Sequence, residues 1–458
     1  MSSSTILADD LDEKHLAVPR PDLVRTESNL EKAIDAEANI NFSAPVEDAE
    51  DSDNSDDPGP APNGGLKAWV QVVGSFFLFF NSWGTVNAFG VFQTYYENNP
   101  RWRETPSNIS WIGSIQAFLL LFVGLASGPA YDNGYFRSLI IGGAILIPFG
   151  FMMTSLANEY WQTMLAQAFC IGIGNGLIFV PSVAILPQYF STRKALANGL
   201  AASGSSFGGL IYPIVFRRMQ QEVGFAWATR TLGFISFATV WFSVFVMKPR
   251  VMPKQRRQLT DFAAFKEIPY TLFCVSMIFG FIGLYGPLYY IGPYSIQNHI
   301  TGENLGFYLL PIINAASIFG RIIPNAIADK IGPLNVLFPC ALVAAILALA
   351  WIGIKNLGGI ITFALIYGFF SGGFVSLPPV AIVTLTQDMS KIGTRMGQCF
   401  FLSAFGLLVG TPVSGAILKN TGSWIGVQLW SGAAILMTAL LMLWARVYVA
   451  GWSPMKRV

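Results

Sequence analysis

The sequence predicts an all-α membrane protein of twelve transmembrane helices arranged in two six-helix halves. Two observations lead to this prediction: apolar runs of membrane-spanning length recur along the chain, and the second half repeats short patterns of the first. The composition agrees, because 53% of the 458 residues are hydrophobic and only 12% are charged. An ordinary soluble domain carries about 25% charged residues.

The first 62 residues differ from the rest of the chain. They hold 16 of the 26 acidic residues and only four of the 28 basic ones. A tract this acidic, with few apolar residues, cannot bury a core, so residues 1–62 are expected to form a disordered cytoplasmic tail. The tail contains no apolar h-region and is therefore not a signal peptide. Gly64-Gly65 follow the tail, and glycine there allows the backbone to turn into the first helix.

Apolar runs long enough to cross about 30 Å of hydrocarbon begin at Leu66. Because they are continuous, they predict helices and not the alternating ten-residue strands of a membrane barrel. The twelve runs are residues 66–92, 109–129, 138–157, 160–187, 195–216, 226–247, 269–292, 304–328, 334–354, 357–384, 395–418 and 423–447.

These runs divide the chain into an N-terminal half (63–247), a central cytoplasmic loop (248–268), a C-terminal half (269–447) and a short C-terminal cytoplasmic tail (448–458). With the acidic tail inside, fifteen Lys and Arg residues flank the cytoplasmic side and six flank the outside. Cytoplasmic loops carry an excess of basic residues. Both termini are therefore predicted to lie in the cytosol.

The two halves repeat each other at a constant spacing. The sequence PSVAI at 181–185 recurs as PPVAI at 378–382, and the same offset of 197 relates Asp132 to Asp329 and Lys194 to Lys391. A constant offset at separate places indicates a duplicated six-helix unit. Two such units around a central site are typical of secondary transporters.

Four motifs resemble those of a known family. GPAYDNGYFR (128–137) and its echo AIADKIG (326–332) resemble the loop signature of the major facilitator superfamily. NGGLKAW (63–69) and YFSTRKALANGLAASGSSFGG (189–209) are similar to its monocarboxylate-porter-like branch, especially the fungal members. The resemblance implies the major facilitator fold and a cytoplasmic latch, or gate, formed by Asp132, Arg137, Asp329, Arg193 and Lys194.

Two positions depart from that pattern. Asn63 stands where the first motif normally has Asp, and Asn87 stands where animal monocarboxylate carriers have a lysine that couples protons to anions. These departures argue against lactate or pyruvate as the cargo.

Arg321 is a charged residue that falls deep within a predicted span, and ionisable groups inside a membrane are functional candidates. The resemblance places it near the solute path, with Ser317 where the family often has an aspartate. A planar guanidinium suits a carboxylate. The alternative is that Arg321 snorkels to the interface or binds backbone carbonyls.

Polar residues of other spans complete the predicted solute site. Their alternative role is hydrogen bonding between helices. They are Asn87, Tyr285, Asn314, Gln116, Asn175 and Gln398. Glycine-rich runs such as 172–176 predict close helix packing and not a dinucleotide site, because no strand precedes them. Asn108 begins an external sequon whose closeness to the second span limits glycosylation.

The predicted function is secondary active transport of a small organic solute by alternating access, with proton coupling as the family expectation. A monocarboxylate-like weak acid or a secondary metabolite is the expected cargo, and metabolite efflux across the plasma membrane is preferred. Uptake of riboflavin or another nutrient, and a non-transporting solute receptor, are the alternatives. The spans contain no His, paired carboxylates or metal-ligand spacing, so no enzyme, metal or cofactor is predicted. Beyond the lipid bilayer, neither a protein partner nor nucleic acid is indicated.

Overall fold

The computed structural model describes residues 61–98, 104–250, 260–386, 388, 391–453 and 456. Within these residues the secondary structure is helical throughout, with no strand. Most of the predicted N-terminal tail, and parts of the central loop and C-terminal tail, lie outside the described residues, so the predicted segment boundaries stay a prediction.

The described part of the first half has eight α-helices, one π-helix and one 3₁₀ helix. They are α2 (Leu66–Asn87), α3 (Phe89–Asn98), α4 (Pro106–Phe122), α5 (Gly124–Asp132), α6 (Phe136–Leu156), α7 (Tyr160–Thr163), the π-helix η1 (Met164–Ile171), α8 (Gly172–Ala184), the 3₁₀ helix η2 (Leu186–Gln188) and α9 (Lys194–Val246).

The second half has seven α-helices within the residues that the structure describes. Its elements are η3 (Phe262–Lys266), α10 (Ile268–Gln297), α11 (Glu303–Ile331), α12 (Pro333–Ala350), η4 (Trp351–Gly353), α13 (Leu357–Ser376), α14 (Pro378–Leu385), α15 (Ile392–Thr421) and α16 (Trp424–Ala450).

The predicted all-α membrane fold is confirmed. Ten helices of the described residues are long and apolar enough to cross a membrane. One of them, α9, holds the fifth and sixth predicted spans and turns between them at Gly224, whose φ is +81°. The first predicted span corresponds to α2 and α3, which meet at Ala88.

Helix breaks distinguish the structure from the predicted continuous spans. The second span divides at Val123, and the tenth divides at Leu377, directly before Pro378. A proline has no backbone N–H to continue the hydrogen-bond ladder, so a break at Pro378 has a simple cause. Apolar pattern alone does not show such breaks, because the residues on both sides are equally apolar.

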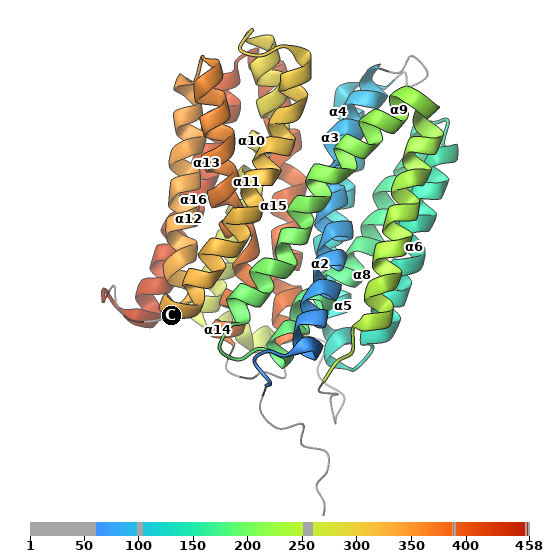
Figure 1. The fold of residues 1–458 in the computed structure, drawn as a ribbon. Helices are drawn as coiled ribbons and strands as arrows, with labels where there is room; N and C mark the ends of the chain where they lie inside the picture. The colour runs from blue at the N-terminus through green and yellow to red at the C-terminus, as the bar shows by residue number, and fades with distance from the viewer. Residues whose placement is uncertain are drawn as a thin grey trace, which may run out of the picture. The chain divides into compact units, whose positions relative to one another are not determined.

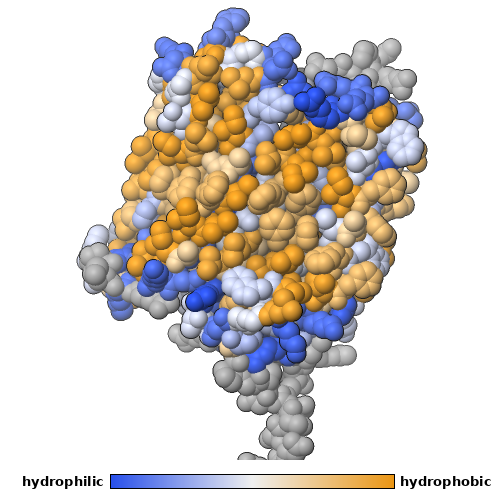
Figure 2. All heavy atoms as spheres, viewed as in Figure 1, coloured by the Kyte–Doolittle hydropathy of each residue, from blue (hydrophilic) through white to orange (hydrophobic). Residues whose placement is uncertain are grey.

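The helices run along one common direction, as Figure 1 shows, and the first described residues lie at the same end of the bundle as the end of α16. We name this the basic end, since it carries the loops predicted to be cytoplasmic, and the other the outer end. Figure 2 shows hydrophobic residues around the middle of one face and hydrophilic residues at both ends. This distribution matches a protein surrounded by lipid.

Two seams join the halves. At one seam α9 packs on α11, and at the other α15 packs on α4 and α5. Both seams therefore place a helix of one half beside helices of the other, and any rocking of the halves has to open and close them.

Glycine allows α2 and α9 of the first half to approach closely, as the glycine-rich motif predicts. A methyl group at Gly204 would lie 2.0 Å from the carbonyl oxygen of Phe76, and one at Gly208 would lie 2.4 Å from that of Phe80. Side chains cannot occupy such positions without moving a helix.

We expect Gly204→Ala to lower the apparent melting temperature of the purified protein by several degrees. The added methyl group overpacks the α2–α9 contact, and overpacking costs about 1–3 kcal/mol. Gly353→Ala is the matched control, because a methyl group there meets no atom within 4 Å. Fluorescence-detected size-exclusion chromatography after heating measures both. Equal melting temperatures for the two variants would show that α2 and α9 are not tightly packed at Gly204.

Candidate functional site

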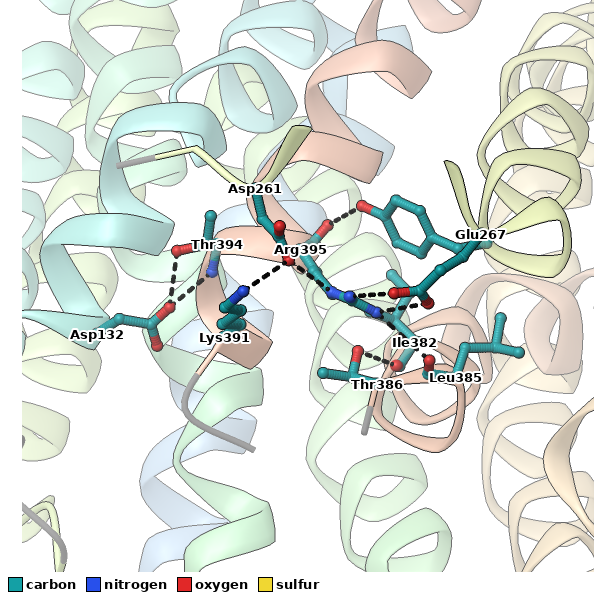
Figure 3. Close-up of polar contacts among 10 residues, drawn as sticks. Asp132, Asp261, Glu267, Ile382, Leu385, Thr386, Lys391, Thr394 and Arg395 are labelled. Carbon is teal, nitrogen blue, oxygen red and sulfur yellow. Dashed lines mark hydrogen bonds and ion pairs between the residues drawn. The ribbon is translucent and has the colours of Figure 1, made fainter. Parts of the chain in front are cut away.

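A carboxylate of the first half caps a helix of the second half at the basic end. Asp132, the last residue of α5, accepts hydrogen bonds from the backbone N–H of Thr394 at 2.7 Å and of Gly393 at 3.3 Å. The Thr394 hydroxyl donates a third at 3.0 Å (Figure 3). The first N–H groups of a helix have no partner inside the helix and favour a negative charge. Asp132 thus joins α5 to the start of α15.

Asp329 makes the corresponding contact in the opposite direction. It lies on α11 of the second half and accepts from the N–H groups of Ala195 and Leu196, at 2.9 and 2.8 Å, in the first turn of α9. The two predicted gate carboxylates therefore each close one seam, and each does so through backbone amides of the other half.

The other predicted gate residues lie near these contacts. The Arg137 guanidinium donates to the carbonyl of Val244, near the end of α9, at 2.7 Å. Arg193 caps α9 without a side-chain capping bond, and Lys194 opens the helix. Their part in gating stays a prediction.

Asn63 connects the two motifs of the porter-like resemblance. Its side-chain oxygen accepts from the N–H groups of Ser191 and Thr192 at 2.6 and 2.8 Å, and its amide donates to the Ser191 hydroxyl. Its φ is +55°, a conformation that asparagine tolerates. The Asn63 side chain thus joins the start of the first half to the loop before α9. Its amide oxygen accepts the hydrogen bonds that an aspartate carboxylate would accept at this position.

An ion-pair cluster, not foreseen from the sequence, surrounds the start of α15 (Figure 3). Arg395 pairs bidentately with Glu267, at 2.5 and 3.0 Å, and with Asp261 at 3.1 Å. Lys391 lies 3.5 Å from Asp261. Arg395 and Asp261 are almost fully buried, whereas Glu267 and Lys391 are partly exposed. The signal that could have revealed it is an acidic pair within an otherwise basic central loop.

A cavity lies between the halves toward the outer end. One part has a volume of about 180 Å³ and is lined by α3, α4, α9, α10, α11 and α15. A wider part of about 830 Å³ adjoins it, and both are lined by Thr94, Pro293 and Phe307. The halves are in contact at the basic end, and the cavity between them lies toward the outer end. The cavity is therefore separated from the basic end by these contacts.

Aromatic rings close the space beneath this cavity. Trp83 of the first half stacks on Phe281 and Tyr285 of the second, with ring centres 5.8 and 6.4 Å apart. Tyr285 stacks in turn on Tyr289, which lines the cavity and donates to the carbonyl of Val86. The predicted solute residue Tyr285 therefore belongs to a layer that spans both halves.

The structure brings two further predicted residues together. Asn87 and Asn314, from opposite halves, both lie against Gly209: a methyl group there would meet the Asn87 Cβ at 2.9 Å and the Asn314 side-chain oxygen at 2.7 Å. Both residues are buried. Neither lines the described cavity.

The remaining amides are separate from this pair. Gln116 and Asn175 both donate to the Thr85 hydroxyl inside the first half, at 3.3 and 2.9 Å. Gln398 lies on α15 of the second half. All three carry a buried side-chain oxygen that no described residue bonds. Such oxygens cost free energy if left unpaired, so they are suited to a partner that arrives from outside the fold.

Asn108 lies in the first turn of α4, where it is exposed and donates to Glu104 at 2.7 Å. Its glycosylation stays a prediction.

Arg321 is buried in the α9–α11 seam and does not line the cavity. Its guanidinium donates to the Ser317 hydroxyl and, across the seam, to the carbonyl of Ala202, both at 3.3 Å. None of the ion pairs among the described residues includes it. A buried cation held only by neutral acceptors is poorly compensated, and an anion is the partner that would compensate it best.

Comparison with known proteins gives consistent results. A family model described as Major Facilitator Superfamily matches residues 72–397. The chain is 48% identical over 382 residues to the MFS-type transporter dbaD of Emericella nidulans, covering 83% of this chain and 86% of that protein. It is 38% identical over 389 residues to the Aspyridones efflux protein apdF of the same organism, covering 85% and 79%.

Among solved structures, the human organic anion transporter MFSD10 superposes with a TM-score of 0.67 at 14% identity, covering 83% of this chain and 100% of that one. At this identity the likeness shows the fold alone.

We expect Asp132→Asn and Asp329→Asn each to weaken closure at the basic end. An amide can still accept a hydrogen bond but lacks the charge that the helix dipole attracts, so each variant loses about 0.3–1 kcal/mol and raises the population of molecules open at this end about two- to fivefold. Energy transfer between dyes at the exposed positions Tyr135 and Ile331, one on each half, reports the opening. Glu222→Gln, an exposed acid at the outer end, is the control and should change nothing. Unchanged transfer in both aspartate variants would contradict the assigned closure.

We expect Arg395→Met to lower thermal stability far more than Lys391→Met. Removing Arg395 takes away the buried partner of the Asp261 carboxylate, and breaking a buried ion pair lowers the free energy of unfolding by about 3–5 kcal/mol. The Lys391 pair is partly exposed, and exposed pairs contribute about 0–1 kcal/mol. Adding Asp261→Asn to Arg395→Met should recover part of the loss. Similar melting temperatures for the two single variants would refute the difference in burial.

Proposed function

Because this chain belongs to the Major Facilitator Superfamily, whose matched relatives are transporters, we propose that it exports a small, acidic, partly aromatic secondary metabolite by alternating access. The observation that supports this most strongly is the pair of reciprocal contacts, Asp132 to α15 and Asp329 to α9, which close the basic end while a cavity remains toward the outer end. The name of one relative, an aspyridones efflux protein, supports the choice of cargo and direction.

Arg321 acts as the loading residue in this proposal. While the basic end is closed, its guanidinium donates to Ala202 of the opposite half and is hidden from the cavity. When the α9–α11 seam opens toward the cytosol, that bond breaks and the guanidinium is free to bind a carboxylate or enolate. Closing the seam restores the bond to Ala202, so the anion loses its partner and is released outward.

Asn87, Asn314 and the layer around Tyr285 lie between Arg321 and the cavity in this scheme. Amide and phenol groups offer hydrogen bonds without a fixed charge, which suits a solute with several oxygen atoms. The asparagine at position 87 also favours such a metabolite over the short acids of the lysine-bearing monocarboxylate carriers.

We place the basic end in the cytosol and the protein in the plasma membrane, in keeping with the excess of Lys and Arg on the loops of that end. For proton coupling, the proton would travel on the weak acid itself, because the described acidic residues lie at helix ends and loops.

We expect Arg321→Gln to reduce transport of acids specifically. Inside-out vesicles from yeast that express the protein should accumulate some members of a panel of aromatic acids and enolic polyketides. The variant should reduce that uptake at least about tenfold, since a hydrogen bond to a charged group contributes about 1.5–3 kcal/mol. Uptake of the neutral methyl esters, measured beside the acids, should not fall.

Arg218→Gln is the control, because Arg218 is an exposed arginine at the outer end of α9. Acid uptake that survives Arg321→Gln as well as it survives Arg218→Gln would exclude Arg321 as the loading residue. Wild-type vesicles that accumulate no member of the panel would refute the proposed cargo class.

A further inference from the structure

Arg217 fastens the outer part of the α9–α11 seam. It lies on α9 of the first half, shortly before the turn at Gly224. Its Nη2 donates to the side-chain oxygen of Asn304 at 2.8 Å, and its guanidinium lies 4.2 Å from the centre of the Phe307 ring. Both partners belong to α11 of the second half, so the contact crosses between the halves. A cation above an aromatic face is attracted to it.

This contact mirrors that of Arg321. Arg321 reaches from α11 to the Ala202 carbonyl on α9, and Arg217 reaches from α9 to Asn304 on α11. About 22 Å of helix separates Ala202 from Arg217, given 1.5 Å per residue. One seam is thus held at two levels by arginines from opposite halves, and alternating access requires each level to open in its turn.

Arg217 also lines the outer cavity and carries an unused hydrogen-bond donor. Its Nη1 is buried and bonds none of the described residues. The side chain lines the part of about 830 Å³, and the aromatic residues Tyr95, Phe216 and Phe307 line the same part. The two Nη groups of a guanidinium form a planar fork that matches the two oxygens of a carboxylate. Once Asn304 is released, that fork is available in the cavity.

We infer that Arg217 is an exit clasp: it holds α9 to α11 while the outer end is closed, and it binds the carboxylate of an aromatic acid on the way out. The acid replaces Asn304 as the hydrogen-bond acceptor, and its ring lies against Phe307 or Tyr95. Outward opening is therefore favoured by the presence of an anion in the cavity. The clasp itself follows from the contacts alone, and the part played by the acid rests on the proposed function.

Distances between spin labels at Val223 and Gly302 test the clasp. Val223 is exposed at the outer end of α9, and Gly302 precedes α11 with no atom within 4 Å of an added Cβ. The half-buried Cys170 is changed to Ser so that it takes no label. We expect Arg217→Gln to raise the long-distance fraction at least threefold. Phe307→Leu, which keeps the Asn304 bond and removes the ring, should raise it less.

Arg218→Gln is the matched control, since it removes the same charge from the next, exposed residue of α9. It should leave the wild-type distances unchanged. If Arg217→Gln and Phe307→Leu both give the same distances as Arg218→Gln, the clasp is overturned.

Benzoate and benzamide, added to the labelled wild type, test the bound group. They share an aromatic ring and differ in charge. Benzoate should raise the long-distance fraction and benzamide should not, and Arg217→Gln should abolish the response to benzoate. A wild type that responds equally to both compounds, or to neither, overturns the binding of an acid by Arg217. Because these distances require no transport, the clasp can hold even if the proposed export fails.

Discussion

The closure at the basic end depends on one kind of interaction, a carboxylate that binds the first amides of a helix in the opposite half. Asp132 does this for α15, and Asp329 does it for α9. The first turn of any helix leaves N–H groups without partners, and the helix dipole adds a partial positive charge. Each carboxylate supplies what its helix end lacks. Because the interaction depends on the exact end of the helix, it is lost as soon as the halves separate.

This closure determines the surroundings of Arg321. With α9 held against α11, the guanidinium has the Ser317 hydroxyl and the Ala202 carbonyl as partners and remains out of the cavity. The same seam carries Arg217 at its outer part. The ion-pair cluster around Arg395 has a different place in the structure: it joins α15 to the central loop within the second half, so it can persist while Asp132 is released. A fixed anchor beside a breakable contact keeps α15 in position for the next closure.

The fold was largely predictable from the sequence, because a helix that spans a membrane requires a long run of apolar residues. Long apolar runs identified the spans, and the offset of 197 identified the two halves. The sequence also indicated Asp132 and Asp329 through their repeated motifs, and the structure shows both carboxylates bonded to helix starts of the opposite half. Their part in gating stays a prediction. Their partners were not predictable, because a backbone N–H is present at every residue except proline and leaves no mark in the sequence. The helix breaks at Val123 and Leu377 were missed for a related reason, since apolar residues continue on both sides.

The candidate solute site was less accessible to prediction. Asn87 and Asn314 meet at Gly209, yet 227 positions separate them in the chain, and only packing of α2, α9 and α11 brings them together. Gln116 and Asn175 hydrogen-bond within the first half instead. Arg395, the first residue of a predicted span, is buried and pairs with Asp261 and Glu267, which the sequence does not indicate. Spacing along a helix indicates which residues are polar, but the partner of each is decided by contacts between distant segments.

The most direct test of this account is hydrogen exchange at the two capped helix starts, residues 192–198 and 391–396, in lipid nanodiscs. The amides of Ala195, Leu196, Gly393 and Thr394 have a carboxylate as their partner, so their protection reports closure. If the two contacts form one closure between rigid halves, Asp132→Asn will speed exchange at 192–198 as well as at 391–396. Faster exchange at 391–396 alone would show that the two carboxylates act separately, and it would contradict the account.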